Sequence, residues 1–136
     1  MRDKKGFTLA ELLVVVAIIG VLVAISIPVF TSQIHKAEVA TDWANVRSYY
    51  SQLQYDFMET GTVKEEYLNE AGKPGLTSFQ LTGQTVKLKA GSIWIAPEDK
   101  NNVAGYNIYY ACNNHHIGSS SDNHQKCILI LPEDKK

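Results

Sequence analysis

An acidic residue lies at the start of a long apolar stretch. Glu11 is the only charged residue between Phe7 and Ile34, and 19 of the 24 residues from Phe7 to Phe30 are apolar. A carboxylate at the centre of a membrane helix costs about 2.5–3.5 kcal/mol, and less near the interface. Glu11 therefore needs a partner, and it is the first candidate for a functional residue.

Two cysteines, Cys112 and Cys127, form a second candidate pair. An even cysteine count in an exported chain favours a disulfide, because the compartment is oxidising. Closing a loop of this length stabilises a fold by about 3 kcal/mol. Free, buried thiols are the alternative.

Three histidines, His115, His116 and His124, lie between the cysteines. Imidazole and thiolate groups are the usual ligands of zinc, but this spacing matches no common zinc motif, and a disulfide would consume the thiolates. A solvated loop is the favoured interpretation, and we expect no metal or other cofactor.

Composition excludes several classes of protein. The chain has 136 residues, enough for one domain, and its formal net charge is −1, so no basic excess points to nucleic acid. There is no nucleophile elbow or phosphate-binding glycine loop. Glu65-Glu66 and Glu98-Asp99 are more typical of solvated turns than of an acid/base pair. We therefore expect no enzyme.

The apolar stretch is long enough to cross a membrane. Leu12 to Ile34 is 23 residues without a formal charge, and such a helix is about 35 Å long against a hydrocarbon core of about 30 Å. Arg2, Lys4 and Lys5 precede it, which predicts a cytoplasmic N-terminus and an exported remainder. A cleaved secretory signal and a plain membrane anchor are alternatives, but neither explains Glu11.

Beyond this stretch the apolar residues become periodic. They recur at intervals of four and three residues, which predicts one stripe along a helix that ends near Gly61; the stripe is Val39, Trp43, Val46, Tyr50, Leu53 and Phe57. Asp42 is expected among the polar residues between them. The sequence thus predicts one helix from Phe7 to Thr60, whose second half packs on a sheet; a coiled coil is the alternative.

The rest of the chain reads as a loop followed by strands. Residues 61–83 are rich in glycine and are expected to form a loop that connects the helix to the strands. Gly91 is expected to allow a hairpin turn between the first two strands. The expected strands are 85–89, 92–96, 106–110 and 127–131. They predict a small antiparallel sheet laid on the amphipathic half of the helix.

Gly20 and Pro28 interrupt the apolar half of the helix. Proline removes a backbone donor and costs about 3 kcal/mol or more in a helix interior. A tolerated kink of a membrane helix is one interpretation. The other is a stretch that loses its helical hydrogen bonds in an assembled state.

The N-terminus resembles that of type IV pilins and pseudopilins. Residues 6–20 read GFTLAELLVVVAIIG: a glycine that ends a short basic leader, then Phe7, then Glu11 as the fifth residue of the processed chain, then an unbroken apolar helix. The resemblance implies a cut between Gly6 and Phe7 by prepilin peptidase, followed by methylation of the Phe7 amino group. It also implies that Glu11 acts in assembly, by pairing with the amino terminus of a neighbouring subunit.

The family also implies an α+β fold with three segments. These are a leader over residues 1–6, a transmembrane and filament-core helix half over 7–30, and an extracellular domain over 31–136 that includes the amphipathic helix half 31–60 and a disulfide-closed C-terminal loop.

The expected function is that of a structural subunit of a type IV pilus, used for adhesion, surface motility or aggregation. The implied partners are copies of the chain itself, the peptidase, membrane lipid before assembly, and a platform protein with a cytoplasmic ATPase; no specific nucleic acid is expected. A pseudopilin of a secretion or competence system is the runner-up, and a membrane-anchored ligand-binding module is a third hypothesis.

Overall fold

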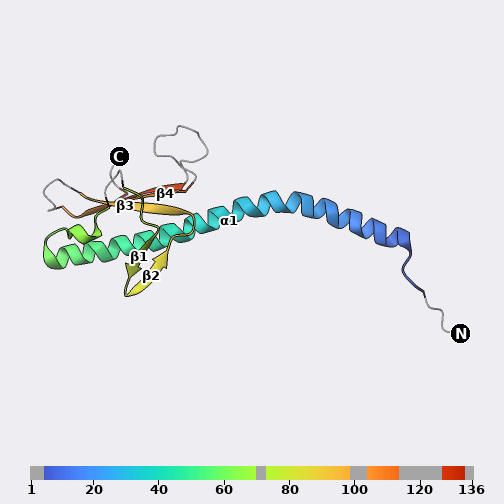
Figure 1. Cartoon of the computed structure of the whole chain (residues 1–136), viewed down its shortest axis with the longest axis horizontal. Helices are drawn as coiled ribbons and strands as arrows, with labels where there is room; N and C mark the ends of the chain where they lie inside the picture. The colour runs from blue at the N-terminus through green and yellow to red at the C-terminus, as the bar shows by residue number, and fades with distance from the viewer. Residues whose placement is uncertain (1–4, 70–72, 99–103, 114–126, 134–136) are drawn as a thin grey trace. The chain divides into compact units, whose positions relative to one another are not determined.

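A computed structural model describes residues 5–69, 73–98, 104–113 and 127–133. The chain divides into two compact units, one up to Lys36 and one from Ala37 onward. The elements in chain order are the helix α1 (Leu9–Thr60), the 3₁₀-helix η1 (Glu65–Tyr67) and the strands β1 (Ser78–Leu81), β2 (Gln84–Lys87), β3 (Gly91–Pro97), β4 (Tyr106–Cys112) and β5 (Ile128–Leu131). Figure 1 shows them along the chain.

The predicted helix is confirmed almost to the residue. It runs from Leu9 to Thr60 without a break. Gly61 follows its last residue, and the N–H of Gly61 donates to the carbonyl of Phe57 at 2.7 Å. Gly61 has a φ of +71°, the left-handed conformation in which helices often end and which glycine adopts without strain.

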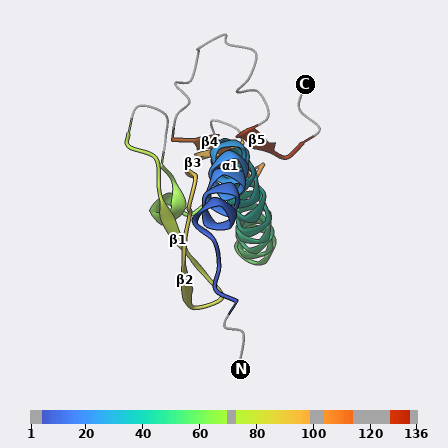
Figure 2. The same ribbon diagram turned by 90° about the vertical axis from the view of Figure 1, so that its right-hand side faces the viewer.

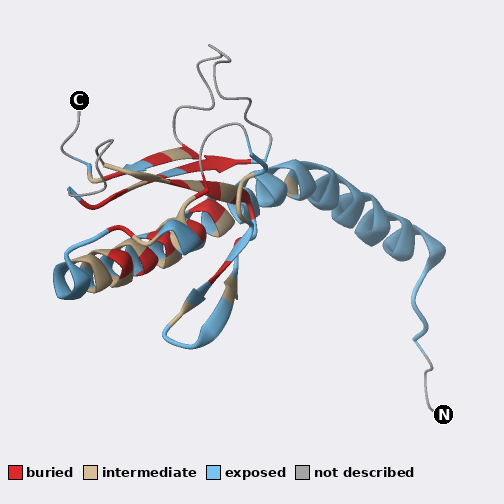
Figure 3. Cartoon of the chain, turned by 60° about the vertical axis from the view of Figure 1, so that its left-hand side comes forward, coloured by how far each residue is buried: buried red, intermediate tan, exposed pale blue. Residues whose placement is uncertain are grey.

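The first unit is the N-terminal part of α1, and its apolar side chains are exposed. They include Leu13, Ile19 and Phe30, each more than half exposed in the single chain. Figure 3 shows this half without a buried residue. The helix is long and apolar enough to span a membrane. Because a helix that is apolar all round has no solvated face, this half needs lipid or other protein around it.

The second unit has the core. Strands β3, β4 and β5 form an antiparallel sheet in that order, and inward-facing residues such as Ile93, Ile108 and Leu129 alternate with outward-facing ones. The sheet covers the C-terminal half of α1, as Figure 2 shows in a view roughly along the helix. The expected antiparallel sheet on the amphipathic helix half is therefore confirmed.

The pairing of the first strands was predicted wrongly. No hairpin joins β2 to β3; β2 pairs with β1, which lies inside the segment that was expected to be a loop. The turn is made by Thr82 and Gly83, both with positive φ, as a two-residue hairpin requires. Gly91 is the first residue of β3 and no turn residue. A Cβ there would lie 2.6 Å from Cζ of Tyr110, so close packing requires the glycine.

The buried stripe of α1 is shifted from the predicted one. Val39, Val46 and Leu53 are buried as expected, whereas Trp43, Tyr50 and Phe57 are only partly buried and flank the core. The stripe is completed by two residues that the apolar pattern did not select, Asp42 and Tyr49. Tyr49 stacks on Phe79 of β1 with ring centroids 4.3 Å apart, which attaches the hairpin to the helix.

Candidate functional site

The helix begins with a reciprocal pair of hydrogen bonds around Glu11. The backbone N–H of Thr8 donates to Oε2 of Glu11 at 2.9 Å, and the N–H of Glu11 donates to Oγ1 of Thr8 at 3.3 Å. This is a capping box, which satisfies two N–H groups that a helix start leaves without partners. Sequence reasoning missed it, although the Thr-x-x-Glu spacing is its signature. In the single chain, Glu11 therefore has a partner within its own first turn.

The residues at the expected cut lie just outside the helix. Gly6 and Phe7 precede Leu9 without regular structure, and the side chain of Phe7 is 95% exposed. A Cβ added at Gly6 would meet no atom within 4 Å. The fold of the single chain thus gives no reason for a glycine at this position.

Gly20 and Pro28 do not interrupt α1 in the single chain, which stays helical through both. Two hydroxyls bond back to helix carbonyls around the proline: Ser26 donates to the carbonyl of Leu22 at 2.7 Å, and Thr31 to that of Pro28 at 3.0 Å. Such bonds are found where helices bend. Whether the stretch opens in an assembly stays a prediction.

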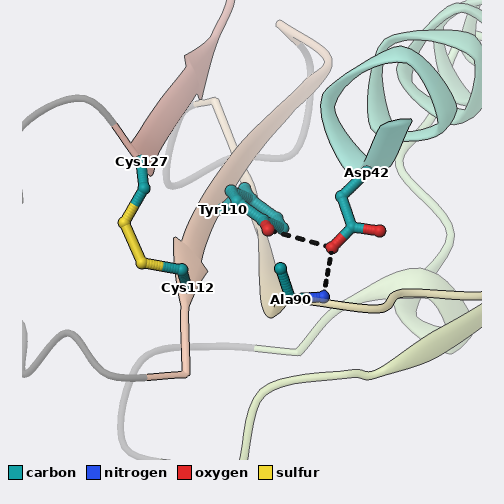
Figure 4. The surroundings of a disulfide bond; sticks show 5 residues. All are labelled: Asp42, Ala90, Tyr110, Cys112 and Cys127. Carbon is teal, nitrogen blue, oxygen red and sulfur yellow. Dashed lines mark hydrogen bonds between the residues drawn. A yellow bond between two sulfur atoms is a disulfide. The ribbon is translucent and has the colours of Figure 1, made fainter. Parts of the chain in front are cut away.

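The two cysteines form the expected disulfide. Cys112 ends β4 and Cys127 precedes β5, with Cα atoms 5.9 Å apart, so the bridge joins two neighbouring strands at one end of their pairing (Figure 4). The bridged residues are 15 apart in sequence. His115, His116 and His124 lie outside the described residues, and the part of the chain that the structure describes has no cluster of metal-ligating side chains.

Asp42 is the residue that sequence reasoning placed wrongly. It was expected on the polar face, but its side chain is completely buried between α1 and the sheet. Its carboxylate accepts hydrogen bonds from the backbone N–H of Lys89 at 2.9 Å, the N–H of Ala90 at 2.8 Å and the hydroxyl of Tyr110 at 2.9 Å. Figure 4 shows Asp42 reaching from the helix to Ala90 and Tyr110.

This arrangement offsets the cost of burying a charge. A buried carboxylate is tolerated when hydrogen-bond donors satisfy its oxygens. Burial raises the pKa of Tyr110 above its usual value, and the hydrogen bond to Asp42 raises it further because it holds the hydroxyl proton. Asp42 thus connects α1 to both the start of β3 and the end of β4. The sequence did offer a signal for this burial: Asp42 lies three residues after Val39, so both side chains lie on the same face of the helix.

The outer face of the three-stranded sheet has an apolar hollow. The hollow has a volume of about 380 Å³ and is lined by Trp94, Ala96, Tyr109, Tyr110, Ala111, Ile128 and Ile130. The described lining has no carboxylate, imidazole or thiol, and its titratable side chains are those of Tyr109 and Tyr110.

Comparison with known proteins identifies the family to which the chain belongs. The family model of the prokaryotic N-terminal methylation motif matches residues 1–27. A major component of the type IV narrow pilus, PilA5 of Thermus thermophilus, is 35% identical over 103 residues, which cover 74% of this chain and 77% of that relative. The chain belongs to the type IV pilin family.

Other relatives match over shorter ranges. The fimbrial protein EcpB of Eikenella corrodens is 35% identical over 80 residues, 59% of this pilin and 43% of EcpB. The type IV major alpha-pilin of Moraxella bovis is 34% identical over 82 residues, 59% of this pilin and 52% of that relative. The pilin therefore spans only about half the length of these two relatives. No solved structure matches it.

The long N-terminal helix, the antiparallel sheets and the C-terminal disulfide agree with the type IV pilin fold. The leader and the apolar helix half fit a membrane-anchored precursor of a surface pilus.

Proposed function

We propose that this pilin is cut between Gly6 and Phe7, methylated at the new terminus, and polymerised through its N-terminal helix half into an extracellular filament for adhesion, motility or aggregation. The observation that carries the proposal is the methylation motif over residues 1–27 on a helix half without a buried side chain in the single chain. Copies of the same helix half supply the surroundings that it needs.

The exposed Gly6–Phe7 segment supports the first step. A peptidase must bind the scissile bond in an extended conformation, and this bond lies outside α1. Since the fold itself does not require glycine at position 6, recognition by an enzyme is a sufficient reason for it. Prepilin peptidase is the proposed enzyme, and a platform protein with a cytoplasmic ATPase is the proposed source of work, because the chain has no phosphate-binding loop.

In the assembled filament, Glu11 is proposed to pair with the Phe7 amino group of a neighbour. Opposite charges attract more strongly in an apolar surrounding than in water. The pair would thus place each arriving subunit at one register, and it would offset the cost of burying both charges.

The proposal is tested on filaments sheared from the cell surface. N-terminal sequencing and intact mass should give a chain that starts at Phe7 and has one added methyl group. A chain that starts at Met1, or after Ala24 as a secretory signal would leave it, contradicts the proposal. Long surface filaments that consist mainly of this chain favour a pilus; a short periplasmic assembly favours the pseudopilin.

A further inference from the structure

The C-terminal half of α1 is held on its sheet by two kinds of contact. Val39, Val46 and Leu53 contribute apolar packing, which is non-directional and roughly proportional to the area removed from water. Asp42 is different, because it accepts three directed hydrogen bonds from the sheet side. Apolar contacts lose energy gradually as surfaces slide, whereas a buried carboxylate that loses its donors becomes an uncompensated charge.

The position of Asp42 along α1 is as important as its partners. The division between the two units falls at Lys36 and Ala37, and Val39 and Asp42 are the first buried residues of α1 after it. Among the described residues, the polar links from α1 to the strands and their flanking residues come later: Arg47 pairs with Glu133, Gln52 accepts from the N–H of Thr82, and Gln54 donates to the carbonyl of Tyr106. A pull along the N-terminal half of α1 therefore reaches Asp42 before these links.

We propose that Asp42, with Tyr110 and the amides of Lys89 and Ala90, is the mechanical joint that holds the C-terminal half of α1 on its sheet when the N-terminal half is pulled. This inference rests on the proposed function, because only a filament applies such a pull. The joint sets the force at which α1 begins to separate from the sheet. Asp42 acts as a positioning residue here: it holds the helix and takes part in no chemistry.

The test uses filaments of full-length chains, stretched one at a time between two beads in an optical trap. Asp42→Asn keeps the size of the side chain and removes its charge, so the onset of extension should shift to lower force. Tyr110→Phe removes one of the three hydrogen bonds and should give a smaller shift in the same direction. Leu53→Ala is the matched control, because Leu53 is buried in the same stripe but lies 11 residues further along α1.

Comparing the onset force of extension with the melting temperature distinguishes a contact that bears the load from one that only stabilises the fold. Leu53→Ala should lower the melting temperature and leave the onset force near that of the wild type. If the onset force follows the melting temperature in all three variants, or if neither Asp42→Asn nor Tyr110→Phe changes it, the inference is wrong. If Asp42→Asn does not fold, Tyr110→Phe decides. If the wild-type chain forms no filaments, the proposed function is wrong, and the joint with it.

Discussion

The two halves of α1 belong to one continuous helix, yet opposite requirements determine their sequences. Up to Phe30 the helix is apolar almost all round and exposes its side chains; after Ala37 it buries one stripe against the sheet and solvates the rest. The second half has its partner within the chain. The first half has none among the described residues, and the proposed partners are lipid and other copies of the chain.

The comparison teaches how one helix can serve two environments. The buried core of the domain lies after position 37, whereas assembly is proposed to depend on residues before it. Substitutions in the two halves should therefore have separable effects, and the following predictions test that separation.

Glu11→Val should have the largest effect, the loss of filaments. The substitution makes the helix more apolar, so membrane insertion should persist, and processing should largely survive because the cut lies five residues away. Mature subunit should then accumulate in the membrane, as fractionation of sheared filaments and membranes would show. Glu59→Val is the matched control, because it removes an exposed carboxylate from the other half of the same helix. Normal filaments from Glu11→Val alone would refute a role for Glu11 in assembly.

Leu53→Ala should lower the free energy of unfolding of the domain by about 2–5 kcal/mol, the usual cost of truncating a fully buried leucine. Leu13→Ala makes the same chemical change on the exposed half and should leave domain unfolding unchanged, while it weakens filaments. Thermal unfolding of the full-length chain in detergent, followed by circular dichroism, measures the stability of the domain in both variants. The yield of sheared filaments measures the effect on assembly. Equal shifts in the two variants would mean that the halves are not separable.

The Cys112→Ser, Cys127→Ser double variant should cost about 3 kcal/mol of stability, the amount expected for closing a loop of this length. The double substitution avoids an unpaired thiol. Denaturant unfolding measures the loss, and non-reducing peptide mapping of the wild-type chain should recover the linked pair. Because the bridge lies in the second unit, filament formation at low temperature should continue. Two free thiols in exported wild-type protein would contradict the bridge.

Alkaline pH should have the smallest effect, confined to the domain. Burial raises the pKa of Tyr49 to about 12, and nearby Tyr67, Tyr106 and Asp56 add to the shift. Between about pH 10, where an unfolded tyrosine titrates, and pH 12, the folded chain holds a proton that the unfolded chain has released. Stability should therefore fall as pH rises through this window. Tyr49→Phe should flatten the decline, measured by chemical denaturation at each pH.

Much of the fold follows from patterns that act along the chain. The extent of α1 was predictable from apolar periodicity and from Gly61, because helix geometry depends on residues three and four apart. The bond between Cys112 and Cys127 was predictable because the sequence has two cysteines and both follow the apolar stretch. The strands were found approximately because each bears its own alternation of apolar and polar residues.

The errors concern relations between distant segments. Nothing local indicates that β2 pairs with β1, because alternation specifies a face and not a neighbour. Asp42 was assigned to the polar face because a carboxylate usually is exposed; its donors, Ala90 and Tyr110, lie 48 and 68 residues away. The cap of Thr8 on Glu11 is the exception, a local signal that was present and overlooked.

That cap has a consequence for the proposed assembly step. In the lone subunit, Oε2 of Glu11 accepts a hydrogen bond from the Thr8 amide of its own chain. A carboxylate has further acceptor sites, so in the proposed filament pair the amino group of a neighbour can bind Glu11 without displacing that amide. The cap holds the carboxylate in place before the neighbour arrives, which lowers the entropy lost when the pair forms.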